Sequence, residues 1–286
     1  MTEPHFEVRI VRLAVGSGVK DALSPRGRRN DSEMMRHLIV ILMDKENKKM
    51  TTAEKGERLI VVTGAAGALG GTLVDHFTKY GDQVVGWDIE APGPGALVED
   101  ERRNTMKWMN VDVTDAGVVE DAVMTVENEL GPIDALIHCA GGFRWSHIED
   151  LDTADIDFLV DLNLRSSLYI ARSLMGKMKE RGRGRLIFIS SRSTTAPSAG
   201  EGAYVATKAG LNALTRALAD EVKASEVRVN ALQPSVIDTP DNRKAMPDAD
   251  FSTWVSRQAL ADLIETLISS TGDAINGAQI AVSGNT

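Results

Sequence analysis

Residues 186–212, LIFISSRSTTAPSAGEGAYVATKAGLN, decide the fold class of this chain of 286 residues. The stretch begins with a short apolar run rich in β-branched residues, which is typical of a strand buried on both faces. A loop rich in Ser and Thr follows, and residues 203–224 have the pattern of a helix. Tyr204 and Lys208 stand four residues apart in its first turns, so their side chains share one helix face. Ser191 stands where the strand ends, and we expect all three groups to meet at the carboxyl edge of a parallel sheet, where ligands bind.

These three side chains suit the movement of a proton on an oxygen while a hydride moves on the adjacent carbon. Free tyrosine has a pKa of about 10. A fixed cation such as Lys208 favours the phenolate, so we expect a lowered pKa for Tyr204 and a role as general acid and base. The Ser191 hydroxyl can hydrogen-bond the same substrate oxygen. A lone Tyr-x-x-x-Lys pair is usually a pair of surface neighbours, so this interpretation depends on the serine and on the upstream motifs.

The composition excludes several kinds of partner. The formal net charge is −9 and the calculated isoelectric point is about 5.2, which argues against a nucleic acid or an anionic membrane as partner. The single cysteine, Cys139, excludes an intramolecular disulfide and predicts a reducing compartment such as the cytoplasm. No apolar run approaches the roughly 20 residues that span a bilayer.

The first part of the chain, residues 1–57, shows no firm helix or strand pattern. It contains a basic patch with Arg26, Arg28 and Arg29, and a short apolar run at 38–43. A partner-binding arm or a poor targeting peptide are the functional alternatives. We expect instead a disordered extension, or sequence upstream of the true start, with residues 1–49 mobile and dispensable. The predicted oxidoreductase domain is then 58–286.

A glycine-rich turn opens this domain. A buried strand at 59–62 leads into TGAAGALG, residues 63–70, and an amphipathic helix follows at 69–80. In the spacing G-x-x-G-x-x-G, Gly64 allows a tight turn, Gly67 lets the backbone approach a ligand, and Gly70 lets the helix pack on the strand. The helix N-terminus then offers free N–H groups to a pyrophosphate. The position of the glycines between strand and helix predicts a dinucleotide site.

The second strand, residues 83–88, ends in Asp88 and indicates which dinucleotide binds. A carboxylate about 20 residues past the glycines can accept hydrogen bonds from the adenine ribose hydroxyls. It would repel a 2′-phosphate, so we expect NAD rather than NADP. Asp112 and Val113 follow the third strand, 106–111, and could flank the adenine.

The remaining pattern alternates strands and helices. Further strands are expected at 133–140, 183–191, 226–232 and 278–282, and helices at 114–130, with Thr114 as its cap, and at 153–181; a loop is expected at 91–104 and a loop-and-helix region at 239–270. Such alternation implies parallel strands joined by helices. The predicted fold is an α/β fold: a single Rossmann-like, doubly wound parallel sheet of about seven strands, with helices on both faces.

With these motifs in place, residues 58–284 resemble the short-chain dehydrogenase/reductase family. The resemblance includes the glycine turn, Asp88, the DVTD stretch at Asp112, the 13-residue gap from Ser191 to Tyr204, and VRVNALQPSVIDT from Val227. It implies that Asn163 holds a water that relays protons to Lys208, which binds the nicotinamide ribose. The predicted catalytic residues are Asn163, Ser191, Tyr204 and Lys208. The predicted cofactor-binding residues are Gly64, Ala66, Gly67, Leu69, Gly70, Asp88, Asp112, Val113, Ala140, Gly141, Tyr204, Lys208 and Pro234, with Ile237 and Thr239 at the carboxamide.

Three departures from the family pattern leave an alternative open. Ala68 replaces the usual middle glycine, His138-Cys139 replaces Asn-Asn, and Ser235 replaces the glycine after Pro234. The glycine spacing and residues 237–254 resemble dihydropteridine reductases, which as a family pattern lack the serine. Ser191 therefore favours a carbonyl or alcohol substrate, whereas residues 237–254 favour a quinonoid pteridine. A non-catalytic NAD-sensing regulator is the third interpretation, although Tyr204 and Lys208 are both present.

The substrate itself is not readable from the sequence. Phe143, Trp145, Met246 and Trp254 could form walls around a flat substrate or could simply pack. A hydroxysteroid, a sugar alcohol, an acyl ketone and a quinonoid pteridine all remain open. His138 and Cys139 lack the spaced partners of a metal site, so we expect no metal and a structural role.

Two helices carry apolar residues on more than one face. Leu164 and Leu168 lie in the helix at 153–181, and Leu211 and Leu214 in the helix at 203–224. A helix of this kind needs a partner beyond its own sheet. Together with the family resemblance, the pattern predicts a homodimer or homotetramer.

Overall fold

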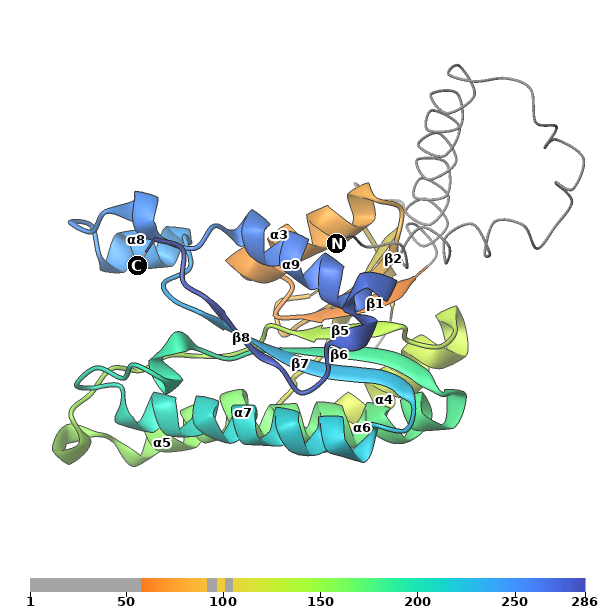
Figure 1. The fold of residues 1–286 in the computed structure, drawn as a ribbon, viewed down its shortest axis with the longest axis horizontal. Helices are drawn as coiled ribbons and strands as arrows, with labels where there is room; N and C mark the ends of the chain where they lie inside the picture. Colours follow the sequence, from red (N-terminus) through yellow and green to blue (C-terminus); the bar gives the residue numbers. More distant parts are fainter. Residues whose placement is uncertain (1–57, 92–96, 101–104, 286) are drawn as a thin grey trace, which may run out of the picture. The chain divides into compact units, whose positions relative to one another are not determined.

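A computed structural model describes residues 58–91, 97–100 and 105–285 of the chain. The extension predicted at 1–57 lies outside the described residues. The described part folds around one sheet of eight strands in the order β3-β4-β2-β1-β5-β6-β7-β8 (Figure 1). The strands are β1 (Leu59–Thr63), β2 (Gln83–Asp88), β3 (Val98–Glu99), β4 (Met106–Asn110), β5 (Ala135–His138), β6 (Arg183–Ile189), β7 (Glu226–Pro234) and β8 (Gln279–Val282).

The predicted doubly wound parallel sheet is confirmed, with one addition at its edge. All strand pairs are parallel except β3 with β4, where Val98 lies opposite Trp108. Strand β3 falls in the region 91–104, which was predicted to be a loop. Two residues are too few to show the alternation that marks a strand, so the pattern could not indicate it.

Helices cover both faces of the sheet, as predicted. Figure 1 shows α3 and α9 on one face and α4, α6 and α7 on the other. The helices are α3 (Ala68–Lys79), α4 (Ala116–Leu130), α5 (Thr153–Val160), α6 (Ser166–Arg181), α7 (Gly202–Glu221), α8 (Pro240–Ala245) and α9 (Arg257–Ile268). Buried apolar side chains of α3 and α9 pack with one face of the strands, and those of α4, α6 and α7 pack with the other. Burial of these two clusters holds the layers together.

The helix predicted at 153–181 is interrupted by one wider turn. Between α5 and α6, Asp161–Arg165 form a π-helical segment, with the side chain of Asn163 buried. The hydroxyls of Ser166 and Ser167 donate to the carbonyls of Leu162 and Asn163, four residues back, at 2.6 and 3.1 Å. Single π-helical turns inside α-helices often lie at functional sites.

Some element limits differ from the sequence prediction. Helix α4 is capped by Asp115, whose carboxylate accepts from the N–H groups of Gly117 and Val118, and not by Thr114. Helix α7 begins at Gly202 and ends at Glu221. Among the described residues, no helix combines the length and hydropathy needed to cross a membrane.

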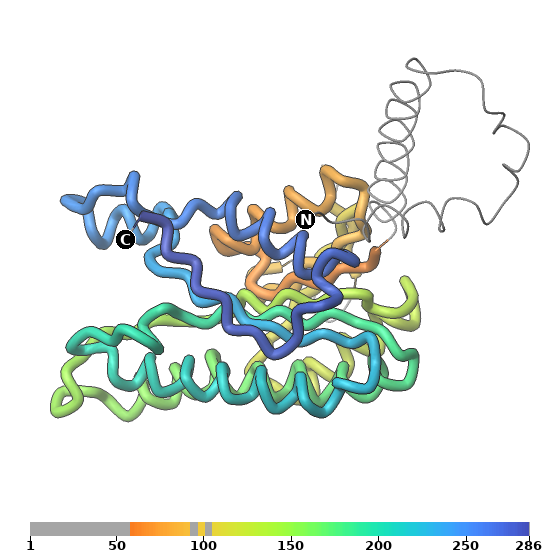
Figure 2. The backbone as a smooth tube through the Cα atoms, viewed as in Figure 1, coloured from red at the N-terminus to blue at the C-terminus, as the bar shows by residue number. Residues whose placement is uncertain are grey.

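The strand order reverses direction between β1 and β5. The chain runs outward from β1 to β2 and β4 and then returns to the other side of β1, as the tube in Figure 2 traces. At the carboxyl ends of these two strands, Thr63 lies opposite His138 in the ladder. Ligands of open α/β sheets bind at such a switch point, so this edge is where the candidate site must be sought.

Candidate active site

Ser191 and Tyr204 meet beyond the carboxyl end of β6. Ser191 follows the strand by two residues, and Tyr204 stands in the first turn of α7. The Ser191 hydroxyl lies near enough to the Tyr204 phenol to influence its pKa. The Ser191 hydroxyl oxygen accepts from the N–H of Ser193 at 3.1 Å, which fixes it in place. The predicted convergence of these two groups is therefore what the structure shows.

Lys208 lies one helical turn after Tyr204 and is only 6% exposed. Its ammonium Nζ donates to the carbonyl oxygen of Ile189 at 2.8 Å and lies 5.9 Å from the centre of the Tyr204 ring. Burial lowers the pKa of Lys208 to about 8. A buried ammonium thus lies close to the Tyr204 ring, and the loss of water around it destabilises its charged form.

The Tyr204 pKa differs from the sequence expectation. Burial raises the pKa of the phenol above its usual value, the hydrogen bond from Ser191 works against this rise, and the Glu201 carboxylate adds to it. The expectation that Lys208 lowers the pKa of Tyr204 below its usual value was wrong. The Lys208 ammonium donates to the Ile189 carbonyl, and burial of the phenol is the largest influence on the Tyr204 pKa. The phenol therefore keeps its proton at neutral pH, as an acid must.

Asn163 holds the loop that follows β5. Its Nδ2 donates to the carbonyl oxygen of Gly142, and its Oδ1 accepts from the N–H of the same residue, both at 2.9 Å. Nδ2 also lies 3.3 Å from the Thr207 hydroxyl of α7. The side chain is 1% exposed, so the structure gives Asn163 a definite task in shaping the loop. Its predicted role in holding a water stays a prediction.

Gly141 lets this loop lie against the candidate catalytic groups. A Cβ at this position would meet Asn163 Oδ1 at 3.1 Å and Lys208 Nζ at 3.3 Å. Both contacts are tighter than ordinary van der Waals spacing. The loop, the lysine and the asparagine therefore share one crowded corner of the site, and a side chain at 141 would displace them. Ala140, the residue before it, is half-buried.

The glycine turn after β1 has the close backbone approach that the sequence predicts. Gly64 has φ +65°, and its carbonyl oxygen accepts from the N–H of Gly67 at 3.0 Å. A Cβ at Gly70 would collide with the Gly64 carbonyl. Ala66 is exposed, and Leu69 is half-buried in the first turn of α3. The first N–H groups of α3 lack helical partners, as at any helix start, and can hold an anion here.

The acids predicted near the adenosine are both tied to the backbone. Asp88 Oδ2 accepts from the N–H of Ala66 at 2.9 Å, and its Oδ1 accepts from the N–H of Glu90 at 3.1 Å. Asp112 is exposed, and its Oδ1 accepts from the N–H and hydroxyl of Thr114 at 2.9 and 2.6 Å. The Val113 side chain is 5% exposed and packs in the core, so only its backbone could reach a ligand.

The segment after β7 contains the residues predicted at the carboxamide. Pro234 is the last residue of β7. The Ile237 carbonyl accepts from Asn242 Nδ2 at 2.8 Å, and the Thr239 hydroxyl caps α8 by accepting from the Asn242 N–H at 3.1 Å. The Ile237 carbonyl and the Thr239 hydroxyl oxygen are therefore both engaged by Asn242, which fixes the geometry of the turn.

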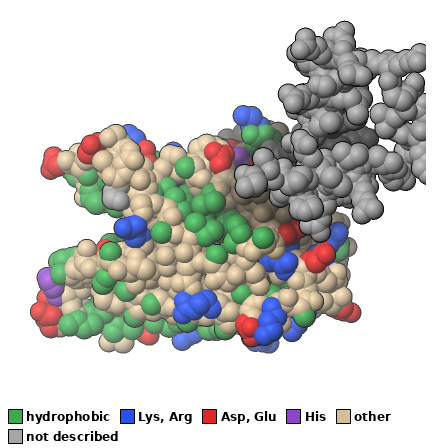
Figure 3. Space-filling view, viewed as in Figure 1, with side chains coloured by type: hydrophobic (Ala, Val, Ile, Leu, Met, Phe, Trp, Pro, Cys, Tyr) green, Lys and Arg blue, Asp and Glu red, His purple; other side chains and the backbone are tan. Residues whose placement is uncertain are grey.

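Four residues predicted to line a substrate differ in exposure. Phe143 is 48% exposed and packs edge-on against the Tyr204 ring, with 5.0 Å between centres. Trp145 is 59% exposed and donates from Nε1 to the Ala199 carbonyl at 3.0 Å. This bond joins the loop after β5 to the loop before α7. Met246 is also exposed, whereas Trp254 is buried against Phe251. Figure 3 shows the surface indented between the part that holds α8 and the part that holds α5.

Two threonines support the site and were not singled out from the sequence. The Thr63 hydroxyl accepts from the N–H groups of Cys139 and Ala140, both at 3.1 Å. The Thr194 hydroxyl donates to the Ser191 carbonyl at 2.8 Å and accepts from the amide of Asn212 at 3.1 Å. Thr63 stands at the start of the glycine turn, and this place next to the switch point was the signal that could have indicated it.

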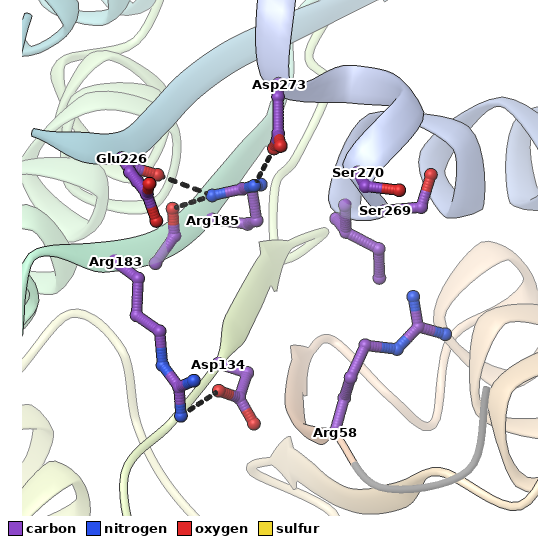
Figure 4. Close-up of a pocket in the computed structure, with 10 residues that line it drawn as sticks. Arg58, Asp134, Arg183, Arg185, Glu226, Ser269, Ser270 and Asp273 are labelled. Carbon is purple, nitrogen blue, oxygen red and sulfur yellow. Dashed lines mark hydrogen bonds and ion pairs between the residues drawn. The ribbon is translucent and has the colours of Figure 1, made fainter. Parts of the chain in front are cut away.

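A polar cavity of about 350 Å³ lies elsewhere, at the amino ends of the strands (Figure 4). Arg183 lies 3.6 Å from Asp134, and Arg185 contacts the Asp273 carboxylate and the Glu226 carbonyl. Arg183 and Arg185 therefore each have an anionic partner, although the buried Arg185 Nε has no hydrogen-bond partner among the described residues. It contains none of the predicted site residues and lies at the edge of the sheet opposite to the candidate site.

Comparison with known proteins agrees with this geometry. A sequence model of the family described as short chain dehydrogenase matches residues 58–250. The gluconate 5-dehydrogenase of Gluconobacter oxydans is 29% identical over 206 residues, which are 70% of this chain and 79% of that protein. The 3-alpha-(or 20-beta)-hydroxysteroid dehydrogenase of Mycobacterium bovis is 30% identical over 233 residues, 80% of this chain and 89% of that protein.

Solved structures share the fold. A short-chain type dehydrogenase/reductase from Mycobacterium ulcerans superposes with a TM-score of 0.72 at 22% identity, over 81% of this chain and 90% of that one. ElxO, solved with NADP bound, has a TM-score of 0.72 at 19% identity, over 80% of this chain and 98% of that one.

Proposed function

Because the chain belongs to the short-chain dehydrogenase/reductase family, we propose that it is an NAD(H)-dependent oxidoreductase acting on a carbonyl or alcohol. The observation that carries the proposal is the proximity of the Ser191 hydroxyl to the Tyr204 phenol, with the buried Lys208 ammonium one helical turn away. A hydroxyl, a phenol and a cation at the carboxyl edge of the sheet can protonate an oxygen and stabilise charge on it.

The residues present fit a dinucleotide. Gly64 and Gly70 allow the close backbone approach, and the start of α3 offers N–H groups to a pyrophosphate. Asp88 stands beside the turn, with its carboxylate held by the Ala66 N–H, and would meet the adenine ribose. When bound, the nicotinamide supplies or accepts the hydride. Tyr204, Lys208, Ile237 and Thr239 would hold its ribose and carboxamide.

In the reductive direction, Tyr204 donates its proton to the carbonyl oxygen as negative charge grows there. Its pKa lies above the usual value, so the proton is present at neutral pH. Ser191 donates a hydrogen bond to the same oxygen, as a group in an oxyanion hole does. The Lys208 charge stabilises the phenolate that remains after the transfer. Stabilisation of the phenolate opposes the rise that burial causes in the Tyr204 pKa.

The proposed substrate class follows from exposed apolar side chains predicted to line the substrate. Phe143 packs on the tyrosine ring, and Phe143, Trp145 and Met246 are large apolar side chains with much of their surface exposed. Exposed apolar side chains gathered at a cleft favour a ligand with an apolar face. We propose a small carbonyl or alcohol with such a face. A quinonoid pteridine is the second candidate, because residues 237–254 resemble the matching part of dihydropteridine reductases.

We also propose that the enzyme is a homodimer or homotetramer in the cytoplasm. Leu168 of α6 and Ile156 of α5 are 45% and 40% exposed, which leaves apolar surface open on that side of the domain. Of the other leucines in the prediction, Leu164 and Leu214 are half-buried, and Leu211 is a core residue. Light scattering at micromolar concentration should give a mass at least twice that of the chain, and a monomer would contradict the assembly.

A screen of NADH oxidation tests the proposed activity. Ketones of increasing apolar surface and quinonoid dihydropterin are offered to the protein, with the Tyr204→Phe variant as a matched control. We expect turnover with a ketone that the control lacks. Binding of NADH without turnover of any ketone or pterin would support the third interpretation, a regulator that senses NAD.

A further inference from the structure

One buried histidine at the switch point has no part in the proposed chemistry. His138 ends β5 and is 3% exposed. Its Nδ1 lies 2.8 Å from the Thr63 hydroxyl oxygen, and its Nε2 lies 3.0 Å from the Ser166 hydroxyl oxygen. The ring therefore joins the end of β1 to the first turn of α6. Both of its nitrogens are used.

The neighbouring hydrogen bonds fix the direction of each bond to the ring. The Thr63 hydroxyl oxygen already accepts from the N–H groups of Cys139 and Ala140, so its own hydrogen points to His138 Nδ1. The imidazole proton is then on Nε2 and is donated to Ser166. The Ser166 hydroxyl in turn donates to the Leu162 carbonyl at 2.6 Å. In this series of hydrogen bonds from Thr63 through His138 and Ser166 to Leu162, every donor has one acceptor, as in a fully satisfied buried network.

The charge of the surroundings agrees with a neutral ring. Burial, and after it the nearby positive charge of Lys208, lowers the pKa of His138 to about 3. Burial also raises the pKa of the Cys139 thiol to about 12, so no anion on this residue compensates an imidazolium. A protonated ring would turn a second N–H toward Thr63, whose hydroxyl oxygen is already an acceptor of two hydrogen bonds.

We propose that His138 is a positioning residue that holds the loop 139–142 at both of its ends, an inference that rests on the proposed function. Thr63 holds the start of the loop through two N–H groups, and Asn163 holds its end at Gly142. His138 connects these two anchors, because Ser166 and Leu162 flank Asn163 in the π-helical turn. Gly141, inside the loop, lies against Asn163 and Lys208, so movement of the loop moves the site.

The polarity of this position dictates the test variants. Position 138 must accept at the δ position, toward Thr63, and donate at the ε position, toward Ser166. An asparagine places its amide oxygen at the δ position and can keep the Thr63 bond, but its nitrogen stops short of Ser166. A glutamine places its amide nitrogen at the ε position and can keep the Ser166 bond. A leucine keeps neither.

The kinetics of these variants separate the two anchors. His138→Leu should lower kcat/KM by about 10²-fold, the effect of a displacement of roughly 1 Å in an active site. His138→Asn should keep NADH affinity within about threefold and lose about tenfold in kcat, because the Asn163 side loosens. Relative to His138→Leu, His138→Gln should restore more of kcat than of the NADH affinity, because glutamine keeps the bond to Ser166 but not the bond to Thr63. If His138→Leu folds and its kcat and NADH affinity both stay within about twofold of the unchanged protein, the positioning role is refuted.

His76 provides a matched control for the loss of a buried histidine. Both of its ring nitrogens are hydrogen-bonded, to Glu265 Oε2 at 2.6 Å and to Gln258 Nε2 at 2.9 Å, between α3 and α9. His76→Leu should lower the melting temperature and leave kcat unchanged at 25 °C. Equal losses of kcat in the two leucine variants, at equal losses of melting temperature, would mean that His138 contributes stability only.

A spectroscopic readout tests the network without any turnover. Long-range ¹H–¹⁵N spectra of the full chain report which ring nitrogen carries the proton. We expect the Nε2–H tautomer of His138 at every pH between 5 and 8, and its loss in Thr63→Val. An Nδ1–H tautomer, or titration in that range, would overturn the inference even if the leucine variant fails to fold. A protein without dehydrogenase activity would contradict the proposed function and leave this spectrum as predicted.

Discussion

The carboxylate of Asp88 accepts a hydrogen bond from the backbone N–H of Ala66 at 2.9 Å, which joins the end of β2 to the glycine turn after β1. A negative charge is therefore fixed beside the place where the adenine ribose of a dinucleotide would lie in this fold. Its second oxygen accepts from the Glu90 N–H at 3.1 Å, so the carboxylate cannot swing away freely.

This relationship predicts tighter binding of NADH than of NADPH. Asp88→Asn keeps an oxygen for the Ala66 N–H but removes the charge and the bond from the Glu90 N–H. It should narrow the difference between the Kd values for NADH and NADPH while keeping the turn. Asp88→Ala should also narrow the gap, and Asp88→Arg should reverse it. Fluorescence titration of both cofactors measures the four proteins. Equal Kd values for NADH and NADPH in the unchanged protein would show that Asp88 does not select the cofactor.

The Ser191→Ala variant separates the two candidate substrate classes. If the substrate is a carbonyl or alcohol, loss of the hydroxyl removes a donor to the developing oxyanion, and kcat should fall by about 10²-fold or more. If it falls less than about tenfold while Tyr204→Phe is inactive, the pteridine interpretation replaces the proposed one. Ser190→Ala is the matched control, since the Ser190 hydroxyl is directed at the Lys208 carbonyl, 3.4 Å away.

Lys208 should cost the fold stability at neutral pH. Its pKa is lowered to about 8 in the folded state, so the unfolded chain holds the proton more tightly. The penalty is complete below about pH 8 and disappears as the pH rises toward the unfolded value near 10.4. Lys208→Met should therefore gain on the order of 1–2 kcal/mol at pH 7, after the loss of its hydrogen bond to Ile189. Activity and NADH affinity should both fall.

Urea unfolding at pH 7 and at pH 10 measures this effect. Lys208→Met should be the more stable protein at pH 7 and should lose this advantage by pH 10, where the unchanged protein still has its hydrogen bond to Ile189. A methionine variant that is less stable at pH 7 would contradict the idea that the buried ammonium opposes folding.

His138 should make the fold sensitive to acid. Its folded-state pKa is lowered to about 3, so between about pH 6.5 and 3 the unfolded chain binds a proton that the folded chain does not. The stability from this group is present above pH 6.5 and is lost as the pH falls, by up to about 1.4 kcal/mol per pH unit. Between pH 7 and pH 5, the unchanged protein should lose more free energy of unfolding than His138→Asn does. Equal losses would mean that the histidine is not buried and neutral.

Much of the fold was predictable because its signals are local. The strand–glycine–helix pattern from Leu59 and the spacing of Ser191, Tyr204 and Lys208 are dictated by backbone geometry within a few residues. Strand β3 is too short to give a pattern. The π-helical turn around Asn163 adds its wider hydrogen bonds inside a helix that looks continuous in sequence.

The electrostatics of the site and the network around His138 could not be predicted in the same way. The direction of the Tyr204 pKa shift follows first from the burial of the phenol, which only the folded structure shows. The partners of His138 come from residues 75 and 28 positions away in the chain. Such contacts are a product of the tertiary fold, and no spacing in the sequence indicates them.

Single-turnover NADH oxidation by Tyr204→Phe tests whether Tyr204 is the proton donor. The phenol oxygen is the only atom removed, and the ring keeps its edge-on contact with Phe143. Any substrate that the unchanged protein reduces can be used, with NADH affinity measured in parallel. We expect a hydride-transfer rate lower by about 10²–10⁴-fold or more at an unchanged Kd for NADH. A rate within about tenfold of the unchanged protein would contradict this expectation, because the proton would then come from a group other than Tyr204.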